Sequence, residues 1–228
     1  MLYPIMLNSL EIDSVIKSYS ELKILTDIYL KCETGDIIGM LGRNGSGKST
    51  LLKIIFGSIT SLNKSIRVNG KVYDRPFKTT GLIGYLPQHP FLLPHLSIYE
   101  TVKLYLDADQ INPFLTDPVI GYLQKSKINS LSGGEQRYLE IKLILHTSNK
   151  FILLDEPFNG VAPIVVEKLK MMITEHSKTK GIILTDHDYN NVMDVANRYC
   201  LVRDGTIKSI GSREDLVKWN YLTENSLR

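Results

Sequence analysis

Cysteine is nearly absent from this chain. Only two occur among the 228 residues, Cys32 and Cys200, and both fall in strand-like segments. A pair of this kind does not make a disulfide framework, and buried free thiols are typical of proteins in a reducing compartment. We therefore expect the two cysteines to fill space in the interior rather than to form a bridge.

Long hydrophobic runs are also missing. No apolar stretch approaches the ~18–20 residues that a helix needs to cross a bilayer, and residues 1–13 lack the cationic start of a signal peptide. The sequence therefore predicts a cytoplasmic chain without a membrane segment of its own. A strong excess of charge is absent too. The net charge is only +3 and the basic residues are scattered, so nothing favours nucleic acid as the main partner.

What the sequence does contain is a glycine-rich loop of the kind that binds phosphates. The pattern G-x-x-x-x-G-K-[ST] is matched by Gly42-Arg43-Asn44-Gly45-Ser46-Gly47-Lys48-Ser49, with an apolar strand before it at 36–41 and a helix-like stretch after it at 49–56. Glycines let successive backbone N–H groups turn toward an anion, and the helix dipole faces the same anion. The pattern predicts that Lys48 reaches the β- and γ-phosphates of a nucleoside triphosphate and that Ser49 holds Mg²⁺.

A second motif opens a later helix. Leu131-Ser132-Gly133-Gly134-Glu135 precedes the run 136–146, in which Leu139, Leu143 and Ile144 recur at helical spacing, so we expect an amphipathic helix. Ser132 and Glu135 form a capping box. That local role does not explain two glycines in a first helical turn, where each costs about 0.8–1 kcal/mol relative to alanine. Glycine is favourable there if a phosphate approaches the helix N-terminus.

The remaining sequence predicts alternating strands and helices. Strands are expected within 1–35 and at 81–86, 151–155, 182–185, 198–202 and 206–210, with a hairpin over 66–73 around Asn69-Gly70. Helices are expected at 98–106, where Ser97 and Glu100 form a capping pattern, in a short piece between Pro113 and Lys125, and near 163–177, 188–196 and 212–219. This alternation is typical of a parallel sheet with helices on both faces.

Six motifs, taken in order, resemble those of the ATP-binding subunits of ABC transporters, and the resemblance covers nearly the whole chain. Residues 42–49 match the Walker A loop and 131–135 the ABC signature. Phe151-Ile152-Leu153-Leu154-Asp155 resembles the Walker B strand, followed by Glu156. Gln88 resembles the Q-loop glutamine, His187 the switch histidine and Tyr19 the aromatic residue that stacks on adenine.

The resemblance implies an α/β fold of the P-loop NTPase type. It consists of a RecA-like core with an N-terminal antiparallel β subdomain and a small inserted helical subdomain. On this reading residues 1–228 form one ABC ATPase domain. Residues 1–88 and 131–228 make up the core with its β subdomain, and 89–130 make up the helical subdomain.

Each motif residue can be given a chemical role. Asp155 ends a buried strand, where a carboxylate is costly unless it meets a cation, and Mg²⁺ is the natural partner. Glu156 can orient or deprotonate the attacking water. Gln88 is expected to touch the metal or the water, and His187 to contact the γ-phosphate. The candidate catalytic residues are Glu156, His187, Lys48 and Gln88, and the candidate metal ligands are Ser49, Gln88 and Asp155. Each also has a plain structural interpretation, such as a turn cap or a solvated loop residue.

The predicted ligands are ATP and Mg²⁺. Nucleotide binding is assigned to Tyr19, residues 42–49, Thr50, Ser132, Gly133 and Gly134. Family geometry places the last three against the ATP of a second subunit, so two chains sandwich two ATP molecules; the second chain is a copy or a related ATPase. The resemblance implies integral membrane permease subunits as partners, with the chain peripheral at the inner face of the membrane. The alternatives are a soluble ABC ATPase and a weakly hydrolysing, ATP-dependent dimerisation module.

The chain departs from the family pattern in several places. The sequence of residues 157–163 is most similar to that of the lipopolysaccharide-export and branched-chain amino-acid members. Ala162, however, replaces their usual aspartate, which contacts the opposite subunit. Tyr138 and Leu143 stand where relatives commonly have arginines, and the stretch 89–130 is short for the family. Residues 219–228 are too few for a regulatory domain, and we expect them either to pack at a dimer contact or to fray.

Overall fold

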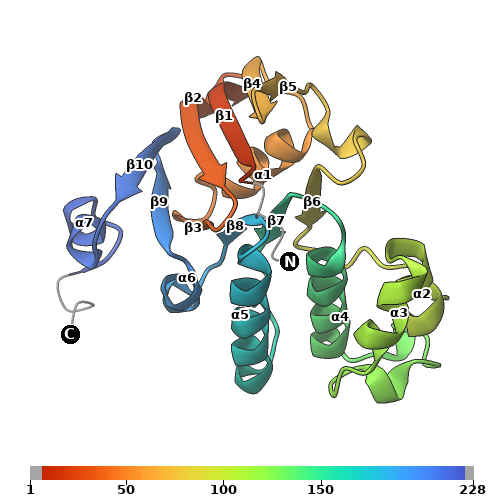
Figure 1. Ribbon diagram of the computed structural model, residues 1–228. Coiled ribbons are helices and arrows are strands. Elements are labelled where there is room, and N and C mark those ends of the chain that lie inside the picture. The colour runs from red at the N-terminus through yellow and green to blue at the C-terminus, as the bar shows by residue number, and fades with distance from the viewer. Residues whose placement is uncertain (1–6, 224–228) are drawn as a thin grey trace.

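Two β-sheets of different kinds organise the chain (Figure 1). This computed structural model describes residues 7–223. The smaller sheet has the strand order β2-β1-β4-β5 and the larger one the order β10-β9-β3-β8-β7-β6. The smaller sheet consists of β1 (Ser9–Tyr19), β2 (Leu22–Glu33), β4 (Asn63–Val68) and β5 (Lys71–Val72).

The smaller sheet is antiparallel and follows from the alternation of its sequence. Leu10 pairs with Cys32, and Ile12 pairs with Leu30, so that apolar side chains of both strands point to one face and are buried. The hairpin between β4 and β5 turns at 69–70, where φ is 52° and 78°. Positive φ at both positions is the type I′ geometry that Asn-Gly favours. The predicted strands and hairpin are therefore confirmed.

The larger sheet is parallel except at the edge strand β10. Every residue of its three central strands is buried, because apolar runs such as these can face helices or strands on both sides. The carboxyl ends of the parallel strands meet at one edge, where ligands bind in such sheets. The strands are β3 (Ile37–Leu41), β6 (Ile83–Leu86), β7 (Phe151–Asp155), β8 (Gly181–Thr185), β9 (Arg198–Arg203) and β10 (Thr206–Ile210).

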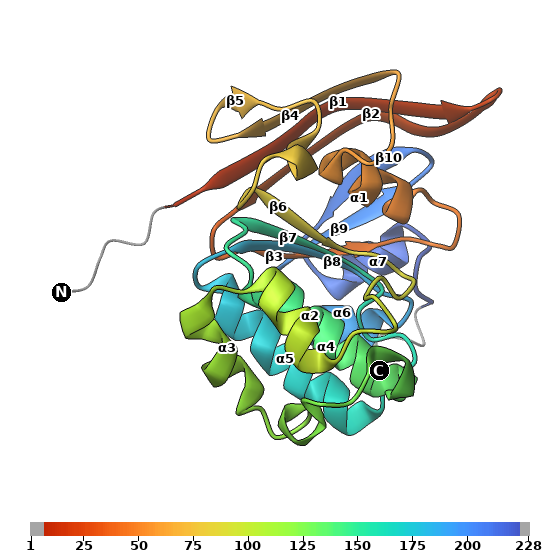
Figure 2. The ribbon, with the colours of Figure 1, turned by 90° about the vertical axis from the view of Figure 1, so that its right-hand side faces the viewer.

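The helices divide between the two faces of this sheet. Helix α1 (Lys48–Phe56) lies between the two sheets (Figure 2) and packs in a cluster with apolar residues from both of them. Helices α4, α5 and α6 cover the opposite face. The other helices are α2 (Ile98–Tyr105), α3 (Ala108–Leu115), α4 (Gly133–His146), α5 (Pro163–Ser177), α6 (Tyr189–Val195) and α7 (Arg213–Lys218), with 3-10 turns at Pro76–Lys78, Gly121–Leu123 and Ile128–Ser130. The expected α/β class is confirmed.

One helix prediction is wrong in position. The short helix expected between Pro113 and Lys125 is α3, which begins at Ala108. Its start is set by a capping box between Asp107 and Gln110, and Pro113 lies inside the helix rather than at its first turn. After α3 ends at Leu115, the rest of the stretch up to Lys125 forms only a 3-10 turn. The start of the helix is marked by the Asp-x-x-Gln pattern and not by the proline.

Helix α4 is not amphipathic, contrary to the expectation. Residues 137–145 are all buried, because the helix lies between the parallel sheet, α5 and the segment that carries α2 and α3. Its polar side chains therefore need partners inside the protein. Lys142 Nζ donates to Asp117 at 2.7 Å, and the Tyr138 hydroxyl donates to the same carboxylate at 2.8 Å. Tyr138 and Lys142 thus tie the segment 89–130 to α4, and we propose this segment as the inserted helical subdomain.

The remaining expectations concern the cysteines and the ends of the chain. Cys32 and Cys200 are buried free thiols, as predicted, and burial raises the pKa of Cys200 to about 12. No helix within residues 7–223 combines the length and apolarity that a bilayer span requires. Of the segment 219–228, Trp219, Tyr221 and Leu222 pack against the interior, while 224–228 lie outside the described residues, as do positions 1–6 of the N-terminal stretch considered above.

Two half-buried histidines join α4 to α5. The ring centroids of His146 and His176 are 4.6 Å apart. Burial lowers the pKa of His176 from 6.5 to about 4, and His146, Lys180 and Lys142 add to this effect while Glu175 opposes it. The fold therefore keeps this imidazole neutral.

Acid should weaken the fold through His176. Its folded pKa lies below its unfolded value, so its stabilising contribution is complete above pH 6.5 and is lost as the pH falls from 6.5 through 4. Allowing for partial exposure, wild type should lose about 1–2 kcal/mol more unfolding free energy over this window than His176→Gln. Urea denaturation at a series of pH values measures the difference. His95→Gln, at an exposed position, should behave as wild type; equal losses in wild type and His176→Gln would refute the assignment.

Candidate functional site

The phosphate-binding loop connects β3 to α1 at the carboxyl edge of the parallel sheet. Gly47 caps α1 with φ 101°, a left-handed conformation that favours glycine. A Cβ on Gly47 would lie 2.9 Å from side-chain atoms of Ile24 and of Leu25, so β2 also limits this position to glycine. The loop is thus formed by its own glycines and held from above by the antiparallel sheet.

Lys48 and Ser46 are two residues of this loop whose polar side chains are placed to bind an anion. Lys48 is 7% exposed, and its Nζ donates to the carbonyls of Gly42 at 2.6 Å and Arg43 at 3.2 Å. Burial lowers its pKa, although Glu156 opposes the shift. The Ser46 hydroxyl is buried without a hydrogen-bond partner. Both groups have donors to offer, so the loop fits the phosphate chain that the sequence predicts.

Asp155 is the centre of a hydroxyl cluster at the end of β7. It is 1% exposed and accepts hydrogen bonds from Ser49 Oγ at 2.9 Å, Thr185 Oγ1 at 3.0 Å and the Tyr85 hydroxyl at 3.0 Å. Burial and the nearby carboxylate raise the pKa of Tyr85. The predicted pair Ser49 and Asp155 is therefore brought together. Sequence reasoning missed Thr185 and Tyr85, although each lies near the carboxyl end of a strand adjacent to β7.

Glu156 contacts two of the other predicted catalytic residues, Gln88 and His187. Its Oε2 accepts from Gln88 Nε2 at 2.7 Å, and its Oε1 lies 2.7 Å from His187 Nε2. Its backbone is in the left-handed region, with φ 50°, which is unfavourable for a side chain larger than glycine. The conformation is fixed because Glu156 N donates both to the carbonyl and to the hydroxyl of Thr185. The carboxylate is held at the end of the sheet, facing the loop.

Arg137 of α4 stabilises this arrangement through several hydrogen bonds. The sequence analysis did not identify it. Its Nη2 donates to the carbonyls of Asp155 at 2.8 Å and Glu156 at 2.9 Å, and its Nη1 donates to Pro87 O at 2.7 Å. Glu140 lies 3.4 Å from Nη1 and is fully buried. Burial lowers the pKa of Arg137, while Glu140 counteracts the shift. One guanidinium therefore joins the Walker B strand to the residue that precedes Gln88. Its only sequence signal was a charge inside the signature helix.

A cleft of about 400 Å³ collects most of the predicted nucleotide residues. Tyr19 lies at its rim, is 50% exposed, and has Lys17 Nζ 4.6 Å from its ring centroid. One ring face is thus occupied by a cation and the other is left for stacking. The lining consists of Tyr19, Ile24, residues 44–50, Gln88, Glu156 and His187.

Five of the residues assigned to nucleotide binding do not line this cleft. Ser132, Gly133 and Gly134 are at the N-terminus of α4, where Ser132 and Glu135 form the expected capping box. Gly42 and Arg43 begin the loop, and their carbonyls accept hydrogen bonds from Lys48 Nζ. The Arg43 guanidinium points away from the cleft and donates to Asn220 O at 3.1 Å. Their roles in nucleotide binding stay predictions.

Ala162 has a clear structural effect. It is the N-cap residue of α5, and no side chain caps that helix. An aspartate at this position would satisfy an N–H group of the first turn. Ala162 is also exposed, so the N-terminus of α5 is uncapped and accessible to solvent.

Removing Arg137 should destabilise the whole domain. Arg137→Met leaves Glu140 buried without its cation and several carbonyls without a donor, and breaking a buried pair in this way costs about 3–5 kcal/mol. Denaturant unfolding measures the loss. Arg67→Met is the matched control, because Arg67 pairs with Glu11 on the partly exposed antiparallel sheet and should cost about 1 kcal/mol or less. Equal, small losses in both variants would contradict the role of Arg137.

Comparisons with known proteins agree with this geometry. The family model for ABC transporters matches residues 25–159. The lipopolysaccharide export system ATP-binding protein LptB of Haemophilus influenzae is 31% identical, covering 93% of this chain and 96% of the relative. LptB of Escherichia coli K12 is 32% identical with the same coverage.

A solved structure of the ATP-binding subunit of an ABC transporter superposes with a TM-score of 0.82 over 93% of each chain. Its 23% identity means that this match concerns the fold. The matched family, the similar sequences and the assembled motifs agree. The chain belongs to the ABC transporter family as one of its ATP-binding, ATP-hydrolysing subunits.

Proposed function

We propose that the cleft binds ATP together with Mg²⁺ and that Glu156 activates the water that attacks the γ-phosphate. The observation that carries the proposal is the contact of Glu156 with both Gln88 and His187, 2.7 Å in each case. A carboxylate in this position is acceptor-only when ionised, so it can take a proton or align a water molecule. Gln88 and His187 orient it, because each occupies one of its two oxygens.

The residues beside Asp155 fit a magnesium ion. Ser49 Oγ and Asp155 Oδ1 are 2.9 Å apart, and both are the hard oxygen ligands that Mg²⁺ prefers. When bound, the ion neutralises charge on the phosphates. Thr185 and Tyr85 then keep the Asp155 carboxylate oriented through their hydroxyls. Lys48 supplies a fixed positive charge to the same phosphates once it leaves the carbonyls of the loop.

We propose that a second ATPase subunit completes the site. A Cβ on Gly133 or Gly134 would meet nothing within 4 Å, so packing within this chain does not require glycine at either position. The two glycines keep the positive end of α4 bare, as the close approach of another subunit's phosphate requires. ATP binding then closes the dimer and hydrolysis opens it, since the nucleotide favours the closed form.

We further propose that the groove beside Gln88 receives a cytoplasmic segment of a membrane permease. The groove has a volume of about 510 Å³ and a largely apolar wall that includes Phe56, Phe77, Tyr85, Pro87, Phe91 and Tyr105. Phe77 is 42% exposed although it stacks on Phe56 at 5.5 Å. Tyr85 also touches Asp155, so an occupant of the groove is one side chain away from the metal ligands. The relatives named above serve an export system.

Substituting Glu156 should separate hydrolysis from binding. Glu156→Gln keeps the shape of the side chain but removes the base, so kcat for ATP should fall by about 10²–10⁴. Mg-ATP should still bind and should hold the variant as a dimer in gel filtration. Glu175→Gln changes an exposed glutamate that pairs only with Lys178 in the described structure and should retain wild-type turnover. Undiminished turnover in Glu156→Gln would refute its role, and absent turnover in wild type would favour the weakly hydrolysing module.

The groove proposal is tested by capture from membranes. Tagged chain incubated with Mg-ATP should recover a polytopic membrane protein from detergent-solubilised membranes, identified by mass spectrometry. Phe77→Asp introduces a charge into the apolar contact and should reduce recovery by about tenfold or more, with unchanged ATPase activity of the isolated chain. Met171→Asp, at an exposed position on α5, is the control and should recover the partner normally. Ribosomal or DNA-repair partners without a membrane protein would instead support the soluble alternative.

A further inference from the structure

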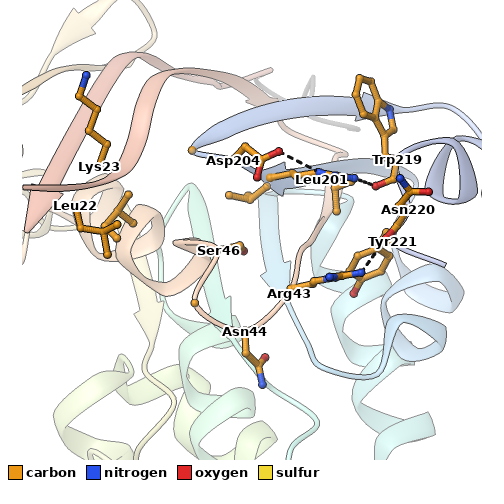
Figure 3. Close-up of a pocket in the computed structure, with 15 residues that line it drawn as sticks. Leu22, Lys23, Arg43, Asn44, Ser46, Leu201, Asp204, Trp219, Asn220 and Tyr221 are labelled. Carbon is orange, nitrogen blue, oxygen red and sulfur yellow. Dashed lines mark hydrogen bonds and ion pairs between the residues drawn. The ribbon is translucent and has the colours of Figure 1, made fainter.

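The C-terminal part of the chain touches the first residues of the P-loop. Arg43 Nη2 donates to the carbonyl of Asn220 at 3.1 Å (Figure 3). Tyr221, the next residue, lines the cavity beside this contact. Residues 219–222 are called the C-terminal anchor below. We propose that Arg43 is a positioning residue, which holds the P-loop against this anchor and thereby sets its affinity for ATP.

The anchor is itself fixed to the core. Tyr221 N donates to the carbonyl of Leu216 at 2.8 Å, and Leu216 is fully buried. Arg203 of β9 donates to the carbonyl of Trp219. Trp219 and Tyr221 also pack against the larger hydrophobic cluster. A contact with this segment therefore restrains the P-loop relative to the sheet.

The anchor holds Arg43, one of the two loop residues whose carbonyls bind the lysine. Lys48 Nζ donates to the carbonyls of Gly42 and Arg43, and Ser46 N donates to Arg43 O at 3.1 Å. Gly42 has φ 152°, and a Cβ there would lie 2.6 Å from Ser46 Oγ and 2.7 Å from Val202 O. A displacement of Gly42 or Arg43 would therefore displace Lys48 and Ser46, whose side chains are placed to bind the phosphates.

The space behind the loop explains why hydrogen bonds are needed there. A cavity of about 370 Å³ lies between the P-loop, the turn after β9 and the anchor (Figure 3). Asn44, Gly45 and Ser46 line this cavity and also line the nucleotide cleft. At these three residues the loop borders open space on both sides, so packing alone does not fix their position. The hydrogen bond from Arg43 to the anchor supplies that restraint.

The effect should fall on binding rather than on the chemical step. Glu156, Gln88 and His187 bond to one another, and within residues 7–223 no hydrogen bond is described between any of them and the anchor. Loosening the anchor leaves this catalytic group in place and raises only the cost of ordering the P-loop around ATP. KM should change while kcat does not.

The experiment compares steady-state ATPase kinetics of the full chain with those of Arg43→Met and Tyr221→Ala. Loss of the hydrogen bond to Asn220 in Arg43→Met should raise KM for ATP about 3- to 10-fold and leave kcat within about twofold. Equilibrium titration with a fluorescent ATP analogue should show the same loss of affinity. Tyr221→Ala removes the ring that packs the anchor against the core, so it should raise KM in the same way. The double variant should show less than the product of the two single effects, because both substitutions act through one anchor.

Controls separate this inference from general damage and from the proposed function on which it rests. Tyr199→Phe removes a hydroxyl that donates to the carbonyls of Met193 and Ala196, away from the P-loop, and should leave KM unchanged. An unchanged KM in Arg43→Met, or a fall in kcat alone, would overturn the anchor proposal while the ATPase function stands. A wild-type chain that neither binds nor hydrolyses ATP would overturn the function itself.

Discussion

The buried negative charge at the end of β7 is the constraint on which the rest of the structure depends. Asp155 is 1% and Glu156 6% exposed, and a carboxylate taken out of water is strongly destabilising unless hydrogen bonds or cations compensate it. Compensation comes from every neighbouring element. Hydroxyls arrive from α1, β6 and β8, and the Arg137 guanidinium of α4 reaches the carbonyls of both residues. The hydrogen bonds that stabilise the buried carboxylates therefore also hold the elements of the site together.

These same contacts connect the nucleotide to the outside of the molecule. Gln88 follows β6 and bonds to Glu156, while Arg137 bonds to Pro87, the residue before Gln88. A change in the charge near Glu156 thus alters partners that border the apolar groove and the segment 89–130. On the other side of the P-loop the contacts of Arg43 reach the C-terminal anchor. Single hydrogen bonds therefore link the nucleotide site to both surfaces, and small displacements can make or break them.

Local patterns predicted what depends on neighbours in sequence. The P-loop, the Asn69-Gly70 hairpin and the Ser132–Glu135 capping box each follow from backbone chemistry within a few residues, and the structure shows all three. Glu156, Gln88 and His187 were also identified, and they meet in one place. The role of Arg137 was not predictable, because the carbonyls to which it donates lie 18 to 50 residues away in the chain. Helix α4 was misjudged for the same reason: helical spacing reveals one apolar face but not that polar residues on the others are buried.

The most direct test of the account is a high-resolution structure of the full chain with Mg²⁺ and a non-hydrolysable ATP analogue. In the computed structure Ser49 Oγ and Asp155 Oδ1 share a hydrogen bond of 2.9 Å, and Lys48 is bound to the carbonyls of Gly42 and Arg43. The account predicts that Mg²⁺ replaces the first contact and that Lys48 turns to the phosphates, with Glu156 still beside Gln88 or His187. Nucleotide bound outside this cleft, with both sets of hydrogen bonds intact, would contradict it.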